Sequence, residues 1–326
     1  MKALVTGATG FIGGALARRL LYEGGTVRCL VRTPNRARHL ERAGARLVTG
    51  DIEAPQTLPK AMAGIDTLFH AAASVDVIQP DRDAILRTNV QGTENVLAAA
   101  KAAQVRRVVY FSSVAALGRK HKDADESVWN DGAYASTYEE SKHKAEQVAL
   151  RYGQNGLHIV HVLPSIVLGP GDPKSGSFFQ RYLRREIPAR PWRDGSASFV
   201  YIDDLVDGVL LAHERGRANE RYIFSQATWT TSHVMAELER ASGVPPPRRV
   251  PRWLALLGAG VEERRARRAH RPPRISREAV RLATRKFGYS GERARRELGW
   301  RPVEFESRFR SVVAHWQGVV RNGQAK

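Results

Sequence analysis

Met1-Lys-Ala-Leu-Val-Thr-Gly-Ala-Thr-Gly-Phe-Ile-Gly-Gly14 opens the chain and decides its fold. The apolar run Ala3-Leu4-Val5 stops at Gly7, and a helical pattern of apolar residues starts at Phe11. This order predicts a strand, a tight glycine turn and a helix. The glycines of the turn follow a G-x-x-G-x-x-G spacing, with Gly7, Gly10 and Gly13. Without Cβ atoms, such a loop lets a pyrophosphate approach the N–H groups at a helix N-terminus. The strand and helix on either side distinguish it from an ordinary glycine-rich turn, so we predict a dinucleotide site.

Length and composition describe a globular protein that works in a reducing compartment. The chain has 326 residues, of which 42% are hydrophobic, enough for a large core in one or two domains. Cys29 is the single cysteine, so no disulfide forms within the chain and no four-cysteine zinc site exists. The glycine loop starts too early to leave room for a signal peptide, and runs such as Trp253–Val261 are too short to span a bilayer. We expect a cytoplasmic protein without a metal site.

The first half alternates strand and helix patterns, which is typical of a parallel sheet covered on both faces. The expected strands are Lys2–Thr6, Thr26–Val31, Arg46–Thr49, Thr67–His70, Arg107–Ser112 and His158–Leu163, with helices near 12–22, 57–63, 83–103 and 137–153. We predict an α/β fold with a Rossmann-type, doubly wound parallel sheet over residues 1–165. Residues 166–326 are expected to form a smaller substrate-binding region, with an extended connector at 245–251. Segments within 199–225, Phe199–Ile202 and Arg221–Phe224, are expected to return to the nucleotide-binding sheet as strands.

The charge is strongly positive, with 52 basic against 33 acidic residues and a net charge of +19. Much of the excess lies after residue 245, and no nucleic-acid-binding module accompanies it, so we expect no nucleic-acid partner. Within residues 253–274, an apolar segment precedes the arginine cluster Arg264–Arg268. Two interpretations stay open: a core helix with a solvated arginine end, or peripheral contact with an anionic membrane surface.

The end of the second strand indicates which cofactor the site prefers. An NAD site carries an acidic residue there, which binds the ribose hydroxyls. Here Arg32 follows Val31, and no carboxylate occurs between Glu23 and Glu41. A guanidinium suits a 2′-phosphate because its planar fork bonds two oxygens at once, so NADP(H) is favoured over NAD(H). The alternative is a solvated surface arginine.

Further along the chain, a catalytic set is indicated by order and spacing. Tyr138 and Lys142 are four residues apart in the expected helix 137–153, so the phenol and the ammonium share one face. A nearby cation favours the phenolate and lowers the pKa of a tyrosine. Ser112 and Ser113 end a strand upstream, where a hydroxyl can polarise a carbonyl. The spacing alone is uninformative, but the order of glycine loop, serine, tyrosine and lysine is complete.

Several segments together resemble one family, the extended short-chain dehydrogenase/reductases, also described as NAD(P)-dependent epimerases/dehydratases. They are Thr6–Gly13, His70–Ala73, Asn89-Val-Gln-Gly-Thr93, Phe111–Gly118, Tyr138-Glu-Glu-Ser-Lys142, Phe199-Val-Tyr-Ile-Asp-Asp204 and Arg295–Pro302. The resemblance covers residues 1 to about 318. It implies the Rossmann fold and transfer of a hydride between nicotinamide and a carbon that is an alcohol in one state and a carbonyl in the other.

The resemblance also implies roles for individual residues. Ser113, Tyr138 and Lys142 would be catalytic, with Ser112 structural; Asn89 would lie near the substrate or simply pack. Asp51 and Ile52, after the third strand, would take the adenine, although Gly-Asp is also a common turn. The implied cofactor-binding set is Gly7, Thr9, Gly10, Phe11, Ile12, Gly13, Arg32, Asp51, Ile52, Ala71, Ala72, Ala73, Tyr138, Lys142, Pro164 and Ile166.

Two departures from the nucleotide-sugar members narrow the function. Those members carry an asparagine and an arginine where this chain has Ile166 and Ala197. The segment Leu163–Pro170 and the Val31-Arg32 pair instead resemble dihydroflavonol-4-reductase-like enzymes. The C-terminal half resembles bacterial relatives of that branch, the hopanoid-associated, sugar-epimerase-like proteins. We expect an NADP(H)-dependent oxidoreductase acting on a small, apolar or lightly polar carbonyl or alcohol.

Two alternatives to this function stay open. One is a sugar or nucleotide-sugar epimerase or dehydratase, and the other is a non-catalytic NADP(H)-sensing regulator. The complete serine, tyrosine and lysine set argues against the regulator. The resemblance also allows a homodimer.

Overall fold

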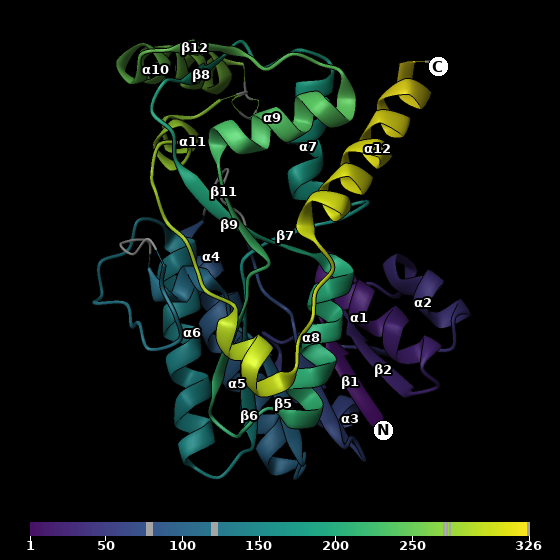
Figure 1. Ribbon diagram of the computed structural model, residues 1–326. Coiled ribbons are helices and arrows are strands. Elements are labelled where there is room, and N and C mark those ends of the chain that lie inside the picture. The colour runs from purple at the N-terminus through teal and green to yellow at the C-terminus, as the bar shows by residue number, and fades with distance from the viewer. Residues whose placement is uncertain (76–80, 119–122, 270, 272, 274, 325–326) are drawn as a thin grey trace.

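The structure, a computed structural model, describes residues 1–75, 81–118, 123–269, 271, 273 and 275–324. Seven parallel strands form the main sheet in the order β10-β6-β5-β4-β1-β2-β3 (Figure 1). Their bounds are β1 Lys2–Thr6, β2 Thr26–Val31, β3 Arg46–Thr49, β4 Thr67–His70, β5 Arg107–Phe111, β6 Ile159–Pro164 and β10 Arg221–Phe224. The order reverses between β1 and β4, where a doubly wound sheet binds its ligands. The predicted Rossmann-type fold is confirmed.

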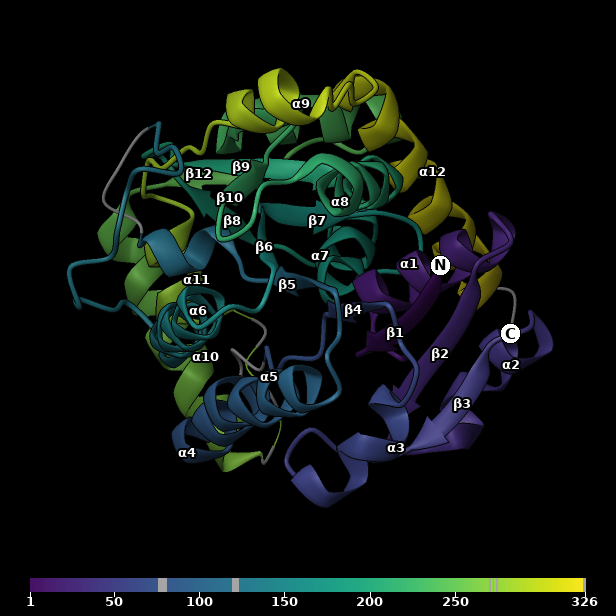
Figure 2. The ribbon, with the colours of Figure 1, turned by 90° about the horizontal axis from the view of Figure 1, so that it is seen from below.

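Helices cover both faces of this sheet, as Figure 2 shows. On one face, α1 (Phe11–Tyr22) and α8 (Ile202–Arg215) pack against the strands through residues such as Leu16 and Leu205. On the other face lie α3 (Leu58–Met62), α5 (Gly92–Ala102) and α6 (Thr137–Gln154). Since both faces are buried, the strands read as continuous apolar runs such as Ala3-Leu4-Val5 and not as alternating patterns.

A smaller region sits beyond the carboxyl ends of the strands (Figure 1). It contains a three-stranded sheet of β7 (Ile166–Leu168), β9 (Ser196–Tyr201) and β11 (Ala227–Thr230), and a two-stranded ribbon of β8 (Ala189–Pro191) and β12 (Arg248–Val250). The helices here are α7 (Pro173–Leu183), α9 (Thr231–Ser242), α10 (Arg252–Arg268), α11 (Arg277–Leu282) and α12 (Phe305–Gln324).

Segment 199–225 divides between the two parts of the molecule. Arg221–Phe224 forms β10 and pairs in parallel with β6, as expected for a strand of the nucleotide-binding sheet. The expectation for Phe199–Ile202 was wrong: most of it lies in β9, which pairs with β7 and β11 in the small sheet. Antiparallel pairing with Ala227–Thr230 decides this, because that strand follows β10 after a short turn and returns alongside β9.

The remaining elements differ from the expectations mainly at their ends. The helix expected at 83–103 is interrupted: α4 (Arg82–Leu86) and α5 flank a π-helical segment, η3 (Arg87–Gln91). Such segments insert an extra residue and often mark functional sites. The connector 245–251 is extended as expected, and β12 in it pairs with β8.

A C-terminal strap, residues 286–305, fastens the small region to the main sheet. It forms isolated bridges from Lys286 to Ser196 and from Tyr289 to Ala124. Trp300 is buried, and its Nε1 donates to the carbonyl oxygen of Asp204 in α8 at 2.8 Å. The buried Asp204 carboxylate accepts from the Val303 N–H at 3.0 Å and from Arg308 Nε at 2.9 Å. The family-like segments around residues 204 and 300 are therefore parts of one structural contact.

Helix α10 is exposed along most of its length, although a core helix was one of the two interpretations. Ala259 and Ala266 are its buried residues, whereas Trp253, Leu254 and Leu257 face solvent. The core-helix interpretation is wrong for this segment. Among the residues that the structure describes, no helix has both the length and the apolar content needed to cross a bilayer.

Candidate active site

The glycine loop has the shape that close approach of a phosphate requires. Gly7 has φ +72°, and a Cβ there would lie 2.7 Å from the Ala72 nitrogen. A Cβ on Gly13 would lie 2.4 Å from the Gly7 carbonyl oxygen, so this position also excludes a side chain. Gly10 caps α1 without a side chain, and the first turn of α1 carries no acidic residue. These residues fit a dinucleotide pyrophosphate, because no Cβ atom at Gly7, Gly10 or Gly13 holds a ligand away from the helix start and the first turn of α1 has no carboxylate to repel an anion.

A buried hydrogen-bond chain holds the loop after β4 against the glycine loop. Thr6 Oγ1 lies 2.8 Å from His70 Nδ1, and His70 Nε2 lies 3.1 Å from Thr93 Oγ1. Thr6 Oγ1 also accepts from the Ala72 N–H at 3.2 Å. Burial lowers the pKa of His70 to about 3, with the Lys142 charge adding to the effect, so the imidazole is neutral. Sequence reasoning did not identify this role of His70, although His70 starts the His-Ala-Ala-Ala segment.

The ends of β2 and β3 place the predicted ribose and adenine residues on the same edge of the sheet. Arg32 directly follows β2 and is exposed. Asp51 follows β3 and is half-buried; its Oδ1 accepts from the Glu53 N–H at 3.1 Å, so its carboxylate also organises the local turn. Ile52 is buried against Gly92, where a Cβ would lie 2.7 Å from Ile52 Cδ1. Ile52 is therefore partly a core residue.

The three predicted catalytic residues come from two contacting elements. Ser113 follows β5 and caps η4 (Val114–Leu117), where its Oγ accepts from the Ala115 N–H at 3.2 Å. Tyr138 and Lys142 lie in the first turns of α6, with Tyr138 half-buried and Lys142 buried. Lys142 Nζ donates to the Phe111 carbonyl oxygen at 2.6 Å. This bond attaches the lysine to the carboxyl end of β5, two residues before Ser113.

A side-chain cap at Ser136 holds the start of α6. Ser136 Oγ accepts from the Glu139 N–H at 3.2 Å, and Glu139 Oε2 accepts in turn from the Ala135 N–H at 2.7 Å. The Glu139 side chain thus reaches one residue further back than in the usual capping box. The cap orients the first turn of the helix, which carries Tyr138.

Asn89 joins the loop after β4 to α6. It is buried in η3, and its Oδ1 accepts from the Ser74 N–H at 2.6 Å. Its Nδ2 donates to the Ser74 carbonyl oxygen and to Ser141 Oγ, both at 2.8 Å. Ser141 Oγ donates to the Tyr138 carbonyl oxygen at 2.8 Å. With its amide satisfied within the protein, Asn89 positions the helix turn of Tyr138.

A buried pair of charged residues, Glu146 and Arg221, lies next to Lys142, with Glu146 one helical turn further along α6. Glu146 is buried, and its Oε1 lies 3.2 Å from Nε of the buried Arg221, whose guanidinium stacks on the Trp129 ring at 4.0 Å. Burial lowers the pKa of Lys142 to about 8, against the opposing effect of the Glu146 charge. Burial also raises the pKa of Glu146, which the charges of Arg221 and Lys142 oppose. Sequence reasoning missed this cluster, for which the i,i+4 spacing of Lys142 and Glu146 was the available signal.

Three residues used in the sequence comparison with nucleotide-sugar enzymes or in the predicted cofactor set, Pro164, Ile166 and Ala197, lie in or next to the small sheet. Pro164 ends β6 and is buried, and Ile166 starts β7 and is 45% exposed. Ala197 lies in β9 opposite Trp229. Because both residues are apolar, neither Ile166 nor Ala197 offers a polar side chain. Of the aromatic residues between 175 and 202, Phe179 and Tyr182 are buried in the core, and Phe199 stacks on Phe305.

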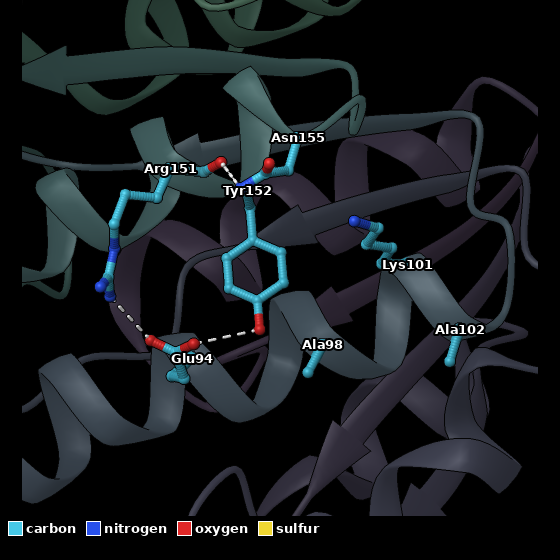
Figure 3. A pocket seen from close by; sticks show the side chains of 7 residues that line it. All are labelled: Glu94, Ala98, Lys101, Ala102, Arg151, Tyr152 and Asn155. Carbon is cyan, nitrogen blue, oxygen red and sulfur yellow. Dashed lines mark hydrogen bonds and ion pairs between the residues drawn. The ribbon is translucent and has the colours of Figure 1, made fainter.

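A depression elsewhere on the molecule does not contain the predicted site. It lies between α5 and α6 and is lined by Glu94, Ala98, Lys101, Ala102, Arg151, Tyr152 and Asn155 (Figure 3). Glu94 accepts from Tyr152 Oη and from Arg151 Nη2, each at 3.1 Å. Glu94 and Arg151 are thus paired with each other, and no predicted catalytic or cofactor-binding residue lines the depression.

Comparison with known proteins identifies the family. The profile of the NAD dependent epimerase/dehydratase family matches residues 3–224, more than half of the chain. The chain belongs to this family. A relative in Synechocystis sp., provisionally named a dihydroflavonol 4-reductase, is 37% identical over 323 residues, 96% of this chain and 93% of the relative.

Two further relatives are similar to this chain over nearly their whole length. Sterol demethylase protein B of Methylococcus capsulatus is 31% identical, covering 96% of this chain and 98% of the relative. The 4-hydroxy-2-methyl-3-oxo-4-farnesyl-3,4-dihydroquinoline-1-oxide ketoreductase of Stigmatella aurantiaca is 33% identical, covering 98% and 95%. The crystal structure of gox2253 superimposes with a TM-score of 0.82 at 32% identity, covering 98% of both chains. The protein is therefore an NAD(P)-dependent oxidoreductase of the extended short-chain type, similar to dihydroflavonol 4-reductases, as predicted.

Proposed function

We propose that the protein is an NADP(H)-dependent carbonyl reductase or alcohol dehydrogenase, in which Ser113, Tyr138 and Lys142 carry the proton chemistry. The observation that carries this proposal is the bond from Lys142 Nζ to the Phe111 carbonyl oxygen. It brings the lysine on α6 to the strand end that presents Ser113, on the same sheet edge as the glycine loop. When bound, the nicotinamide supplies the hydride chemistry.

Each residue of the set has a distinct part in the proposal. Tyr138 exchanges a proton with the substrate oxygen, and Ser113 hydrogen-bonds the same oxygen. The Lys142 cation favours the phenolate of Tyr138 and lowers its pKa toward working pH. With a pKa of about 8, Lys142 is mostly protonated at neutral pH. Asn89 acts indirectly as a positioning residue, through Ser141 and the helix turn of Tyr138.

For the cofactor, we propose NADP(H) in preference to NAD(H). Arg32 stands exposed directly after β2, where an NAD enzyme would carry a carboxylate. Gly7, Thr9, Gly10, Phe11, Ile12 and Gly13 would hold the pyrophosphate, and Asp51 and Ile52 the adenine. Ala71, Ala72, Ala73, Pro164 and Ile166 would complete the cofactor surface, with Tyr138 and Lys142 at the nicotinamide ribose.

The proposed substrate is an apolar or lightly polar ketone, aldehyde or alcohol. A diphosphate in the cleft needs donors that offset its desolvation, and the side chains of Ile166 and Ala197 cannot donate. The names of two relatives, a sterol demethylase protein and a ketoreductase for a farnesylated quinoline, support a hydrophobic substrate. We place the enzyme in the cytoplasm, consistent with the single, buried, free thiol of Cys29.

The decisive experiment compares two substrate classes with the same enzyme preparation. NADPH oxidation is followed with a panel of aliphatic, aromatic and terpenoid ketones and aldehydes, and UDP and dTDP sugars are added as competitors. We expect turnover of hydrophobic carbonyls without competition. Epimer formation without net change of cofactor, or micromolar binding of sugar nucleotides, would assign the protein to the epimerases instead. NADPH binding with no turnover on the whole panel would indicate a regulator.

A further inference from the structure

One exposed face of α10 changes from apolar to cationic along the helix. Trp253, Leu257 and Val261 are four residues apart and therefore lie on one side, with Leu254 beside them. Trp253 is 64% exposed and Leu257 59%, values far above those of core residues. Continuing at steps of three and four residues, the same face carries Arg264 and Arg268, which are also exposed.

The acidic residues of α10 point the other way. Glu262 and Glu263 are mostly buried, and each is engaged by an arginine that follows the helix. Glu262 Oε1 lies 2.7 Å from Arg271 Nη1, and Glu263 Oε2 lies 2.9 Å from Arg277 Nε. The outward face of α10 therefore presents apolar side chains and positive charge, while the helix's negative charge is neutralised on its inner side.

The elements next to α10 extend this composition. Helix α10 packs against β8, and β8 pairs with β12. Trp192, which follows β8, is 61% exposed, and Arg248 and Arg249 of β12 are exposed as well. Figure 1 places α10 at the end of the molecule toward which the strands of the main sheet run. The surface is thus on the same side of the molecule as the catalytic residues.

We propose that the exposed face of α10 binds the surface of an anionic phospholipid bilayer. Apolar side chains that include a tryptophan insert at the boundary between headgroups and acyl chains, and arginines contact the anionic headgroups. A second copy of the chain fits this face less well, because self-association would bring two arginine clusters together. Membrane contact would hold the enzyme at a surface in which water-insoluble alcohols and ketones dissolve.

Flotation of the full-length protein with vesicles tests this proposal. The vesicles contain either phosphatidylcholine alone or phosphatidylcholine with phosphatidylglycerol at about 2:1, at low and at high salt. We expect flotation with the anionic vesicles at low salt only, with a blue shift of tryptophan fluorescence. The double variants Trp253→Ser/Leu257→Ser and Arg264→Glu/Arg268→Glu should each weaken binding at least tenfold. All four positions are exposed, so the fold should persist.

Matched controls separate the surface from general apolarity and charge. Tyr22→Ser removes an aromatic side chain that is 89% exposed on α1. Arg18→Glu/Arg42→Glu changes the net charge as much as the α10 arginine variant does, at exposed sites on α1 and α2 (Arg38–Arg42). Both should float like the wild type.

Three results would overturn the proposal. The first is equal flotation of the wild type with both vesicle types. The second is a loss of vesicle binding in the control variants as large as in the α10 variants. The third is a Trp253→Ser/Leu257→Ser variant that binds vesicles like the wild type but has a lower mass than the wild type in sedimentation. The last would make the face a dimer interface. No substrate is used, so the result is independent of the proposed reductase activity.

Discussion

The buried Lys142 ammonium should make the enzyme less stable than it would be without that charge. Its pKa falls from the ordinary 10.5 to about 8. At about 1.4 kcal/mol per pKa unit, keeping this amine protonated costs the folded state about 3 kcal/mol at neutral pH. In Lys142→Met, loss of the hydrogen bond to the Phe111 carbonyl oxygen offsets about 1–2 kcal/mol of that gain. We therefore expect this variant to be more stable than the wild type by about 1–2 kcal/mol near pH 7, and inactive.

The stability difference between Lys142→Met and the wild type should depend on pH, because the Lys142 amine titrates only in the wild type. Between pH 8 and 10.5 the unfolded chain keeps the lysine proton while the folded enzyme has released it, so this group makes wild-type stability rise with pH. The variant lacks this contribution. Its advantage should therefore shrink across this window and vanish by about pH 10.

Equilibrium unfolding in urea at a series of pH values measures this difference directly. Lys101→Met on α5 is the matched control, because Lys101 is exposed and the change should stay within about 0.5 kcal/mol at every pH. A Lys142→Met protein that is less stable than the wild type by a constant amount at all pH values would refute the reasoning. It would mean that the Phe111 carbonyl oxygen and the Glu146 charge fully offset the cost of removing the ammonium from water.

Three further predictions concern the cofactor and the proton. Arg32→Ala should weaken NADPH binding about ten- to a hundredfold, because a charged hydrogen bond contributes about 1.5–3 kcal/mol, and should leave NADH binding nearly unchanged. Titration of both cofactors checks this, and equal weakening of the two would contradict it. Tyr138→Phe should keep the fold and NADPH binding yet lose most of the roughly 10²–10⁴-fold acid–base contribution; a steady-state rate above about a tenth of wild type would contradict it. Gly13→Ala should abolish cofactor binding, since the new Cβ would meet the Gly7 carbonyl oxygen at 2.4 Å. Gly318→Ala, whose Cβ meets nothing within 4 Å, is the control. Unchanged cofactor binding by Gly13→Ala in calorimetry would contradict the assignment of this loop to the pyrophosphate.

The nucleotide-binding half was predictable because its signals are local. A buried parallel strand is a short apolar run between turns, and each of the first four expected strands matches the structure at both ends. The cap of α6 was likewise encoded within a few residues, in Ser136 and Glu139. The i,i+4 spacing of Tyr138 and Lys142 placed both residues correctly on one helix.

Features that depend on distant partners were not predictable. Phe199–Ile202 reads as a strand, but nothing in it shows that β11 would pair with it in a separate sheet. Glu146 and Arg221 are 75 residues apart, and their contact follows from the crossover that sets β10 beside β6. The π-helical segment at Arg87–Gln91 arises where Asn89 is held by Ser74 and Ser141, neither of which is close to it in sequence.

The C-terminal strap and β10 limit how genes of this kind can recombine. A single crossover near residue 165, the predicted end of the nucleotide-binding half, would take β6 from one parent and its neighbour β10 from the other. Trp300 and Val303 hydrogen-bond Asp204 in α8, and α8 packs on α1. The same crossover would therefore place α8 and its C-terminal partners from one parent against α1 from the other. New substrate preferences are therefore more readily acquired through two separate cassettes, residues 166–201 and 225–285, than through exchange of a whole C-terminal half. Chimaeras built on these two cassettes should retain the inherited sheet, whereas tail-swapped chimaeras inherit a mismatched one.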